Sequence, residues 1–144
     1  MVKLRTGDAW MPAPTYGHSL TGLTVNLLVA DMEDALTFQR EVLAATVIYA
    51  DADFAALEGY GSCWCLHADH TYSDHPLHGV ATHAQGRGPG IELRLHGRDP
   101  DAAEVAARAG GYTVLAGAMD KPHGLRESCL LDSDGYCWVP DVPA

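Results

Sequence analysis

The chain repeats one order of predicted elements, and this repeat limits the folds that are open to it. Residues 23–30 (LTVNLLVA) are apolar and favour a β-strand. Asp31 then suits the N-cap of a helix that we predict to about Ala44, because apolar residues recur there at helical spacing. Three extended segments follow, TVIYAD, DFAALEGYG and SCWCLHAD. The first half therefore has the order β-α-β-β-β.

The second half has the same order. IELRLHG (91–97) predicts a strand, Asp99 caps a helix with Pro100 at its favoured first position, and Gly110 and Gly111 end that helix. YTVLAGA, LRESCLLD and GYCWVPDV predict three more strands. The two capping aspartates are 68 residues apart, although the halves share little sequence. We predict an α+β fold of two βαβββ modules joined by a loop.

A chain of 144 residues suits one compact domain. We predict an N-terminal arm over residues 1–21 and a single domain over 22–144. Within that domain, module one spans 22–70, a linker spans 71–89 and module two spans 90–144.

Composition excludes two classes of partner. The formal net charge is −10 and the chain has nine Lys and Arg residues, so a surface for nucleic acid or an anionic membrane is not expected. The four cysteines have no CxxC spacing and are expected to be free thiols. Asp8, Pro12 and Pro14 interrupt the early residues, which resemble neither an export signal nor a membrane anchor. We therefore expect a cytoplasmic protein.

The segments VNLLVADMEDALTFQREVL and LLDSDGYCWVPDV resemble the vicinal oxygen chelate superfamily, which includes glyoxalase I, extradiol dioxygenases and bleomycin-resistance proteins. The resemblance covers about residues 22–142. The final motif is its most specific part, with Ser133 in place of the usual proline, while Gln39 and Ala44 replace a usual tyrosine and glycine. The resemblance implies a half-open, mixed-sheet barrel whose concave faces enclose a substrate cavity.

The resemblance also implies positions for metal ligands, and two of them hold unsuitable residues. Thr24 and Val139 occupy these positions, and neither side chain is a credible ligand for a divalent ion. We therefore expect no metal at the usual site and no cofactor. An altered divalent-metal site stays open as an alternative, with Glu92 and His67 as ligands and Cys65 or Cys137 as a third.

Charged residues alternate in the first strand of module two and suggest a ligand site. Glu92 and Arg94 share one face, opposite Ile91, Leu93 and Leu95. We predict that they line the concave face beside Asn26, where Arg94 would hold a carboxylate or phenolate and Glu92 would accept from a donor. The other residues predicted to line the site are His67, Trp64, Tyr60 and Tyr136. A shallow, wet face on which the charged pair is merely solvated is the alternative.

Histidines are dense around the linker and invite a metal interpretation. Their spacing, however, fits neither one helix face nor a known zinc pattern, and the segment is rich in Gly, Pro and polar residues. We therefore expect a solvated loop or a lid over the barrel mouth rather than a metal site. The five histidines are His67, His70, His75, His78 and His83.

The arm is too apolar for an idle tail, and its Trp10 and Tyr16 should cover a surface. Pro12 and Pro14 favour an extended strap over a helix. The resemblance implies dimers, so we predict a homodimer whose arm packs against the partner or closes one end of a barrel. The alternative is a monomer whose arm folds back on its own subunit.

Two classes of function remain after these observations. We predict a small-molecule-binding protein that lacks the usual metal. The alternative is an enzyme, either a metal-dependent lyase, isomerase or dioxygenase with an altered ligand set, or a metal-free one in which Glu92 and a histidine act as acid and base.

Overall fold

Module one has the predicted order of elements in the computed structural model, which describes residues 2–82 and 86–144. Its single long helix begins after the predicted cap, and three strands follow it. The elements are β1 (Val25–Val29), α2 (Met32–Glu41), β2 (Thr46–Ala50), β3 (Phe54–Gly59) and β4 (Ser62–Ala68).

Module two repeats this order over its own length. The elements are β5 (Glu92–His96), α4 (Pro100–Ala109), β6 (Thr113–Asp120), β7 (Leu125–Leu131) and β8 (Cys137–Pro143). Both helices are capped as predicted, because Asp31 accepts from the backbone N–H of Asp34 at 3.0 Å and Asp99 from that of Asp101 at 2.9 Å. Such caps contribute about 1 kcal/mol each.

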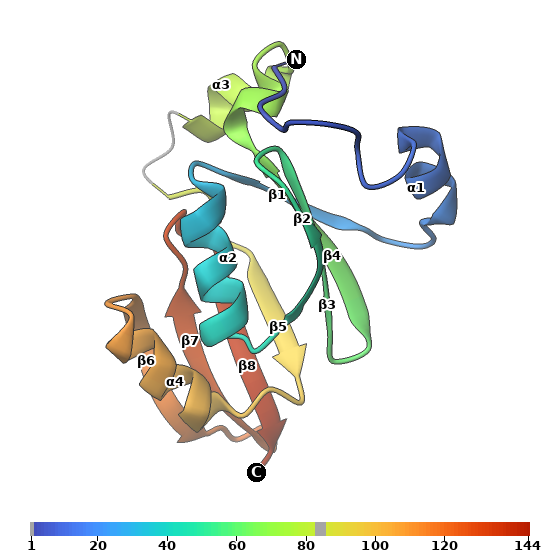
Figure 1. Cartoon of the computed structure of the whole chain (residues 1–144). Coiled ribbons are helices and arrows are strands. Elements are labelled where there is room, and N and C mark those ends of the chain that lie inside the picture. The colour runs from blue at the N-terminus through green and yellow to red at the C-terminus, as the bar shows by residue number, and fades with distance from the viewer. Residues whose placement is uncertain (1, 83–85) are drawn as a thin grey trace.

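Each module forms its own four-stranded mixed sheet (Figure 1). The strand orders are β1-β4-β3-β2 and β5-β8-β7-β6. In both sheets the first strand pairs parallel with the last, and the other pairs are antiparallel. The sheets are not closed into a barrel. This confirms the predicted α+β fold with a half-open arrangement.

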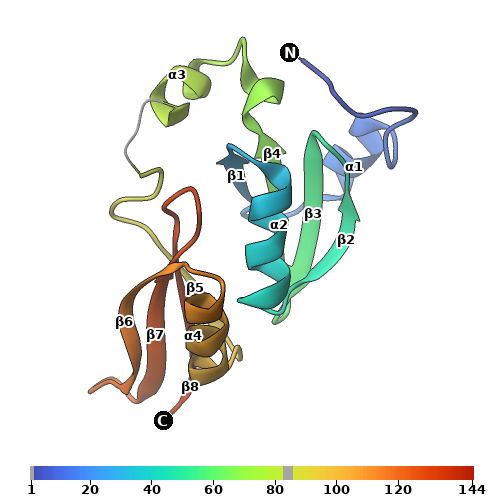
Figure 2. The ribbon, with the colours of Figure 1, turned by 60° about the vertical axis from the view of Figure 1, so that its left-hand side comes forward.

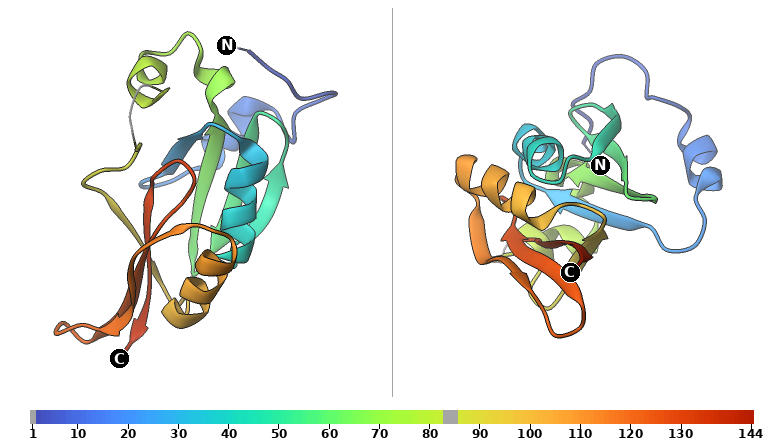
Figure 3. Two further views of the ribbon diagram at one scale, coloured as in Figure 1. Left: turned by 90° about the vertical axis from the view of Figure 1, so that its left-hand side faces the viewer. Right: turned by 90° about the horizontal axis from the view of Figure 1, so that it is seen from below.

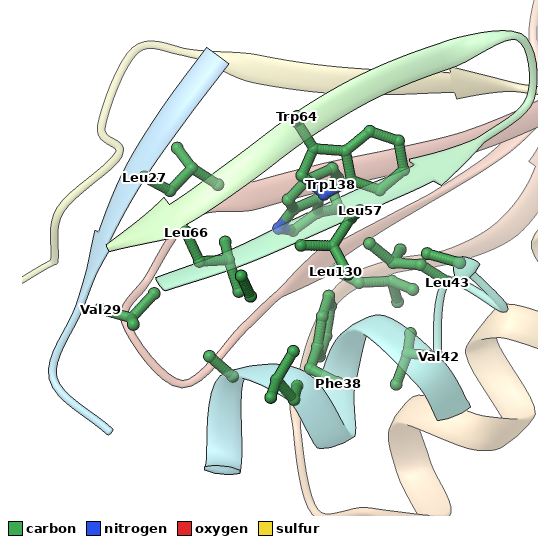
Figure 4. Close-up of a cluster of buried hydrophobic side chains, with 14 of the residues drawn as sticks. Leu27, Val29, Phe38, Val42, Leu43, Leu57, Trp64, Leu66, Leu130 and Trp138 are labelled. Atoms are coloured by element: carbon green, nitrogen blue, oxygen red, sulfur yellow. The ribbon is translucent and has the colours of Figure 1, made fainter. Parts of the chain in front are cut away.

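One hydrophobic core joins the two modules (Figure 4). Phe38 of α2, Leu57 of β3 and Leu130 of β7 are fully buried within it. The indoles of Trp64 and Trp138, one from the last strand of each module, lie 5.8 Å apart between ring centroids. Because the core takes side chains from both modules, neither module buries its apolar surface alone.

The buried indole N–H groups explain one departure from the family pattern. Trp64 donates from Nε1 to Oε1 of Gln39 at 2.9 Å, and Gln39 is itself buried. Trp138 donates to Oδ2 of Asp132 at the same distance. A buried N–H without an acceptor is costly, and Gln39 supplies the acceptor that the indole N–H of Trp64 needs. Ala44, at the position of a usual glycine, takes φ of 52°.

The arm contains a helix, α1 (Ala13–Ser19), so the prediction of an extended strap is wrong in this segment. Pro12 is its N-cap and Pro14 lies in its first turn, where a helix needs no backbone N–H. Figure 2 shows α2 in front of the module one sheet and α1 behind it, and the view from below in Figure 3 agrees. The arm thus lies on the sheet face that α2 leaves uncovered.

The linker also carries helical segments, η1 (Asp69–Tyr72) and α3 (Pro76–Thr82), rather than the loop expected from its composition. His75 begins the turn into α3, since its Nδ1 accepts from the backbone N–H of Leu77. His83 lies outside the described residues. Over the part of the chain that the structure describes, no helix is long and apolar enough to cross a membrane.

Candidate functional site

The face of each sheet opposite its helix, called here the open face, carries the polar side chains. Strand alternation sends Trp64 and Leu66 of β4 into the core and leaves Cys65 and His67 on the open face of module one. Asn26 of β1 lies beside them, because it is opposite Cys65 in the strand register. The structure therefore brings together Asn26 and His67, two of the predicted site residues.

Asn26 organises a small hydrogen-bond cluster on this face. Its Oδ1 accepts from Nδ1 of His67 at 2.5 Å and from Sγ of Cys65 at 3.4 Å, and its Nδ2 donates to the hydroxyl of Tyr72 at 2.8 Å. Because the amide oxygen can only accept, His67 carries its proton on Nδ1 and presents Nε2 as an acceptor. Burial, and then the charge of Lys3, lower the pKa of His67 to about 4, so the ring is neutral at pH 7.

Aromatic rings from the arm cover this face. Trp10 stacks on Tyr49 of β2, with centroids 5.3 Å apart and an interplanar angle of 7°. Tyr16 of α1 meets Phe54 of β3 edge-on at 5.3 Å, and Phe54 lies 4.9 Å from the ring of His67. These contacts join rings of the arm to rings of the sheet, so the arm packs directly against the open face of module one.

Asp53, at the start of β3, fastens the beginning of the arm. Its side chain is 1% exposed and accepts from the backbone N–H groups of Leu4 at 2.7 Å and Arg5 at 3.3 Å. Nε2 of His70 donates to it at 2.7 Å. Burial raises the pKa of Asp53, but the hydrogen bonds from His70, Leu4 and Arg5 outweigh burial and hold that pKa below its usual value.

A pocket of about 410 Å³ lies between the arm and the open face of module one. Its size falls in the range of small-molecule sites. Its lining includes aromatic side chains of both the arm and the sheet, and two cations of the arm contribute as well. The lining includes Lys3, Arg5, Trp10, Tyr16, Tyr49, Phe54 and His67.

The open face of module two carries an ionic network instead. Arg94 pairs with Glu92 at 3.0 Å, with Asp141 at 3.1 Å and, more closely, with Glu127. His96 donates from Nδ1 to Asp141 at 2.7 Å. The Glu92 side chain is 56% exposed and that of Arg94 is 29% exposed. Three carboxylates therefore already engage the guanidinium that was predicted to hold a ligand.

The predicted site residues thus fall into separate places. Glu92 and Arg94 are on the open face of one sheet, while Asn26 and His67 are on that of the other, and no contact among the described residues joins the two pairs. Trp64 is not a wall of the open face, because alternation with Cys65 turns its indole into the core.

The hydroxyl groups of Tyr136 and Tyr60, two residues predicted to line the site, both donate to backbone carbonyl groups. Tyr136, just before β8, donates from its hydroxyl to the backbone carbonyl of Leu28 at 2.8 Å and so ties module two to module one. Tyr60 donates to the carbonyl of Leu43. Tyr136 also lines a space of about 300 Å³ between β1 and β5, whereas Tyr60 packs against the core.

Sequence reasoning missed Arg5 and Tyr49 of the pocket lining. It also missed Asp53, which binds the arm, and Tyr72, which binds Asn26, because these partners lie far away in the chain. One signal was available, namely the density of aromatic residues in the arm, which indicated a covering role without indicating the surface covered.

The residues present do not fit the metal of the vicinal oxygen chelate proteins. Val139 is 1% exposed and Thr24 lacks a suitable donor. In the alternative set, Glu92 and His67 lie on different sheets and are each engaged by another side chain. Within residues 2–82 and 86–144, no three His, Cys, Asp or Glu side chains are grouped so as to hold an ion.

Comparison with solved structures identifies the fold. A glyoxalase-related enzyme from Fulvimarina pelagi superposes with a TM-score of 0.67 at 17% identity, covering 85% of this chain and 87% of that one. A glyoxalase/bleomycin resistance protein/dioxygenase family enzyme from Burkholderia phytofirmans PsJN gives 0.66 at 19%, covering 84% and 97%. The fold is that of the glyoxalase/bleomycin resistance/dioxygenase proteins.

A third protein with this description, from Nocardioides, gives a TM-score of 0.60 at 21% identity, covering 90% of this chain and 91% of that one. No protein-family model and no curated protein sequence matches the chain. The predicted resemblance to the vicinal oxygen chelate superfamily is therefore confirmed at the level of the fold. Identities this low do not carry an activity from one protein to another.

Proposed function

We propose that the protein binds a small organic molecule in the module one pocket, beneath the arm, without a metal ion. The observation that carries the proposal is the ring-lined space of about 410 Å³, which the arm closes against Tyr49, Phe54 and His67. Apolar walls with a few converging polar groups are the usual composition of a ligand site. The polar groups of the lining include the cations of Lys3 and Arg5, the carboxylate of Asp51 and the imidazole of His67.

The donor chemistry supports a metal-free site. The nearest acidic side chains, Asp51 and Asp53, are occupied by hydrogen bonds from Tyr49, from backbone N–H groups and from His70. Nδ1 of His67 is already hydrogen-bonded to Oδ1 of Asn26. We therefore propose that binding requires no cofactor.

A cytoplasmic homodimer is also part of the proposal. Large apolar side chains stand exposed outside the pocket, and a second copy of the chain would cover them; they include Leu23, Ile91, Leu115 and Met119. The four cysteines are free thiols, which suits a reducing compartment. Light scattering of the full chain and of a chain lacking residues 1–16 tests the dimer and the part of the arm in it. A monomeric mass for the full chain would contradict it.

A thermal-shift screen tests the binding function. The chain, purified without an affinity tag, is screened against divalent metals, aldehydes, catechols and antibiotics, and its metal content is measured. We expect organic compounds to raise the melting temperature of the unmodified chain but not of Trp10→Ala. Val105→Ala, which alters an exposed side chain on α4, serves as the matched control.

Two results would overturn the proposal. One is a set of compounds that stabilise Trp10→Ala as strongly as the unmodified chain. The other is a stoichiometric metal ion that ligand binding requires.

A further inference from the structure

Arg5 lines the module one pocket and carries a buried donor. Its Nε is buried and has no hydrogen-bond acceptor among the described residues, although the residue lines the pocket. A guanidinium keeps its protons at every physiological pH, so this N–H always needs an acceptor. Buried donors without partners are rare in proteins, and they indicate an unseen partner or a functional role.

The position of Arg5 is set by its own backbone and by Asp53. The backbone N–H of Arg5 donates to Oδ2 of Asp53 at 3.3 Å, and its NH1 lies 3.6 Å from the same oxygen. Oδ1 of Asp53 is taken by Leu4 and His70. The carboxylate therefore anchors Arg5 at the pocket without supplying an acceptor to Nε.

The charges around the pocket favour an anion. Lys3 is a second cation of the lining. Asp51 is the carboxylate of the lining, but its Oδ1 accepts from the backbone N–H groups of Asp53 and Phe54, and its Oδ2 accepts from the hydroxyl of Tyr49. A negatively charged oxygen in the pocket would thus meet donors whose carboxylate neighbours are already engaged.

The walls favour a flat ring. Trp10 and Tyr16 belong to the arm, and Tyr49 and Phe54 belong to the sheet. The rings contact one another directly in pairs, by stacking or edge contact, and all four residues line the pocket. Aromatic surfaces stabilise planar aromatic ligands through offset stacking and edge-to-face contacts, in addition to burial of apolar area.

Resting on the proposed function, we propose that its ligands are planar aromatic carboxylates, with the ring among Trp10, Tyr16 and Phe54 and the carboxylate accepting from the guanidinium of Arg5. The arm then does more than cover the sheet, because it supplies both the recognition of charge and part of the ring surface.

Isothermal titration calorimetry with four probes tests this class. 2-Naphthoate has the ring and the charge, 2-acetylnaphthalene has the ring and a neutral group of similar shape, 2-naphthylmethylamine has the opposite charge, and decahydro-2-naphthoate has the charge without the flat ring. We expect 2-naphthoate to bind about tenfold or more tightly than each of the others, as suits a charge-assisted hydrogen bond and an aromatic contact.

Two variants of Arg5 assign the preference to its guanidinium. Arg5→Lys keeps the charge but lacks the planar set of guanidinium donors, and Arg5→Met lacks both. Both should reduce the affinity for 2-naphthoate about tenfold while changing that for 2-acetylnaphthalene by less than about twofold. Arg108→Met, which removes an exposed cation of α4, is the control and should change neither. Circular dichroism checks that each variant is folded.

The results separate this inference from the function on which it rests. A folded Arg5→Met that keeps the full preference for 2-naphthoate would overturn the inference, as would equal affinities for all four probes. If the broader screen finds ligands but 2-naphthoate does not bind, the inference fails and the binding function stands. If no compound of either set binds, both fail.

Discussion

Equivalent positions of the two sheets hold different pairs of side chains. Leu28 is opposite His67 in the register of module one, as His96 is opposite Asp141 in module two. Leu28 is therefore equivalent to His96. Asn26 and Arg94, each two residues earlier, are equivalent to each other. Asn26 and His67 form a neutral hydrogen bond, whereas Arg94 and Asp141 form an ion pair.

The difference suits the position of the arm, which packs on the open face of module one. A neutral pair loses little when aromatic rings exclude water from it, and the arm packs over it. The pair in module two belongs to a network of three carboxylates and one guanidinium, in which Asp141 is already buried. Covering the exposed Glu92 and the partly exposed Arg94 as well would carry a large desolvation cost. One backbone plan thus carries an aromatic pocket in module one and an ionic network in module two.

The largest expected effect comes from removing the carboxylate that fastens the arm. Asp53→Ala should lower the free energy of unfolding by about 2–3 kcal/mol, because it leaves the N–H groups of Leu4 and Arg5 without their acceptor. Asp141→Ala, at the buried carboxylate of module two, should cost less, about 1 kcal/mol, because Arg94 keeps Glu92 and Glu127 and the other donor it releases, His96, is exposed to water. Urea denaturation measures both, and equal losses would contradict the comparison.

A smaller effect should appear on acidification and should come from module one. The pKa of His67 is lowered to about 4, first by burial and then by Lys3, against about 6.5 when unfolded. The stability that neutral His67 contributes is present above pH 6.5 and is lost as the pH falls towards 4. We expect a loss of about 2 kcal/mol between pH 6.5 and 4.5. The curve for His67→Gln should be flatter over this window, and parallel curves would argue against the assignment.

Breaking the network of module two should affect stability but not binding. Arg94→Met removes the cation from among Glu92, Glu127 and Asp141, and should lower the free energy of unfolding by about 1 kcal/mol at low salt, less at high salt. The affinity for 2-naphthoate should stay unchanged. A loss of binding in this variant would instead move the site to module two, where the sequence alone had suggested it.

The smallest effect is a difference in thiol reactivity, measured by iodoacetamide labelling at pH 8 and peptide mass spectrometry. Cys63 is exposed and should react first. Burial raises the pKa of Cys65 to about 11 and that of Cys137 to about 12, so both should react slowly. Releasing the arm with Asp53→Ala should speed the labelling of Cys65 and leave Cys137 unchanged. Equal acceleration at both cysteines would mean that the arm does not shield module one selectively.

Much of the fold was predictable because it depends on local patterns. Asp31 and Asp99 cap their helices as their side chains suggest, and alternation assigned Leu93 and Leu95 to the core side of β5. Ile91, predicted on the same core face, instead lies before the strand and is exposed. The arm was harder, because Pro12 and Pro14 are compatible with an extended strap and also with the first turn of a helix. Local sequence does not choose between these conformations, since the choice depends on the surface to which the segment packs.

The candidate site was predictable only in part. Asn26 and His67 were selected and lie together, but Glu92 and Arg94 were placed beside them and instead belong to the other sheet. Periodicity assigns a side chain to a face of its own strand, and it does not say which faces meet. Arg5 and Asp53 are 48 residues apart and show no local pattern that pairs them.

The sequence by itself determined the repeat of elements, their boundaries within a few residues, the capped helices and the core side of Leu93 and Leu95 in β5. These follow from hydrogen bonding and apolar periodicity over short spans of chain. Only the tertiary structure decided that the arm lies on module one, that Asp53 holds it there, and that the ionic pair stays outside the pocket. Those outcomes depend on desolvation and on contacts between distant residues, which are fixed when the chain packs and not before.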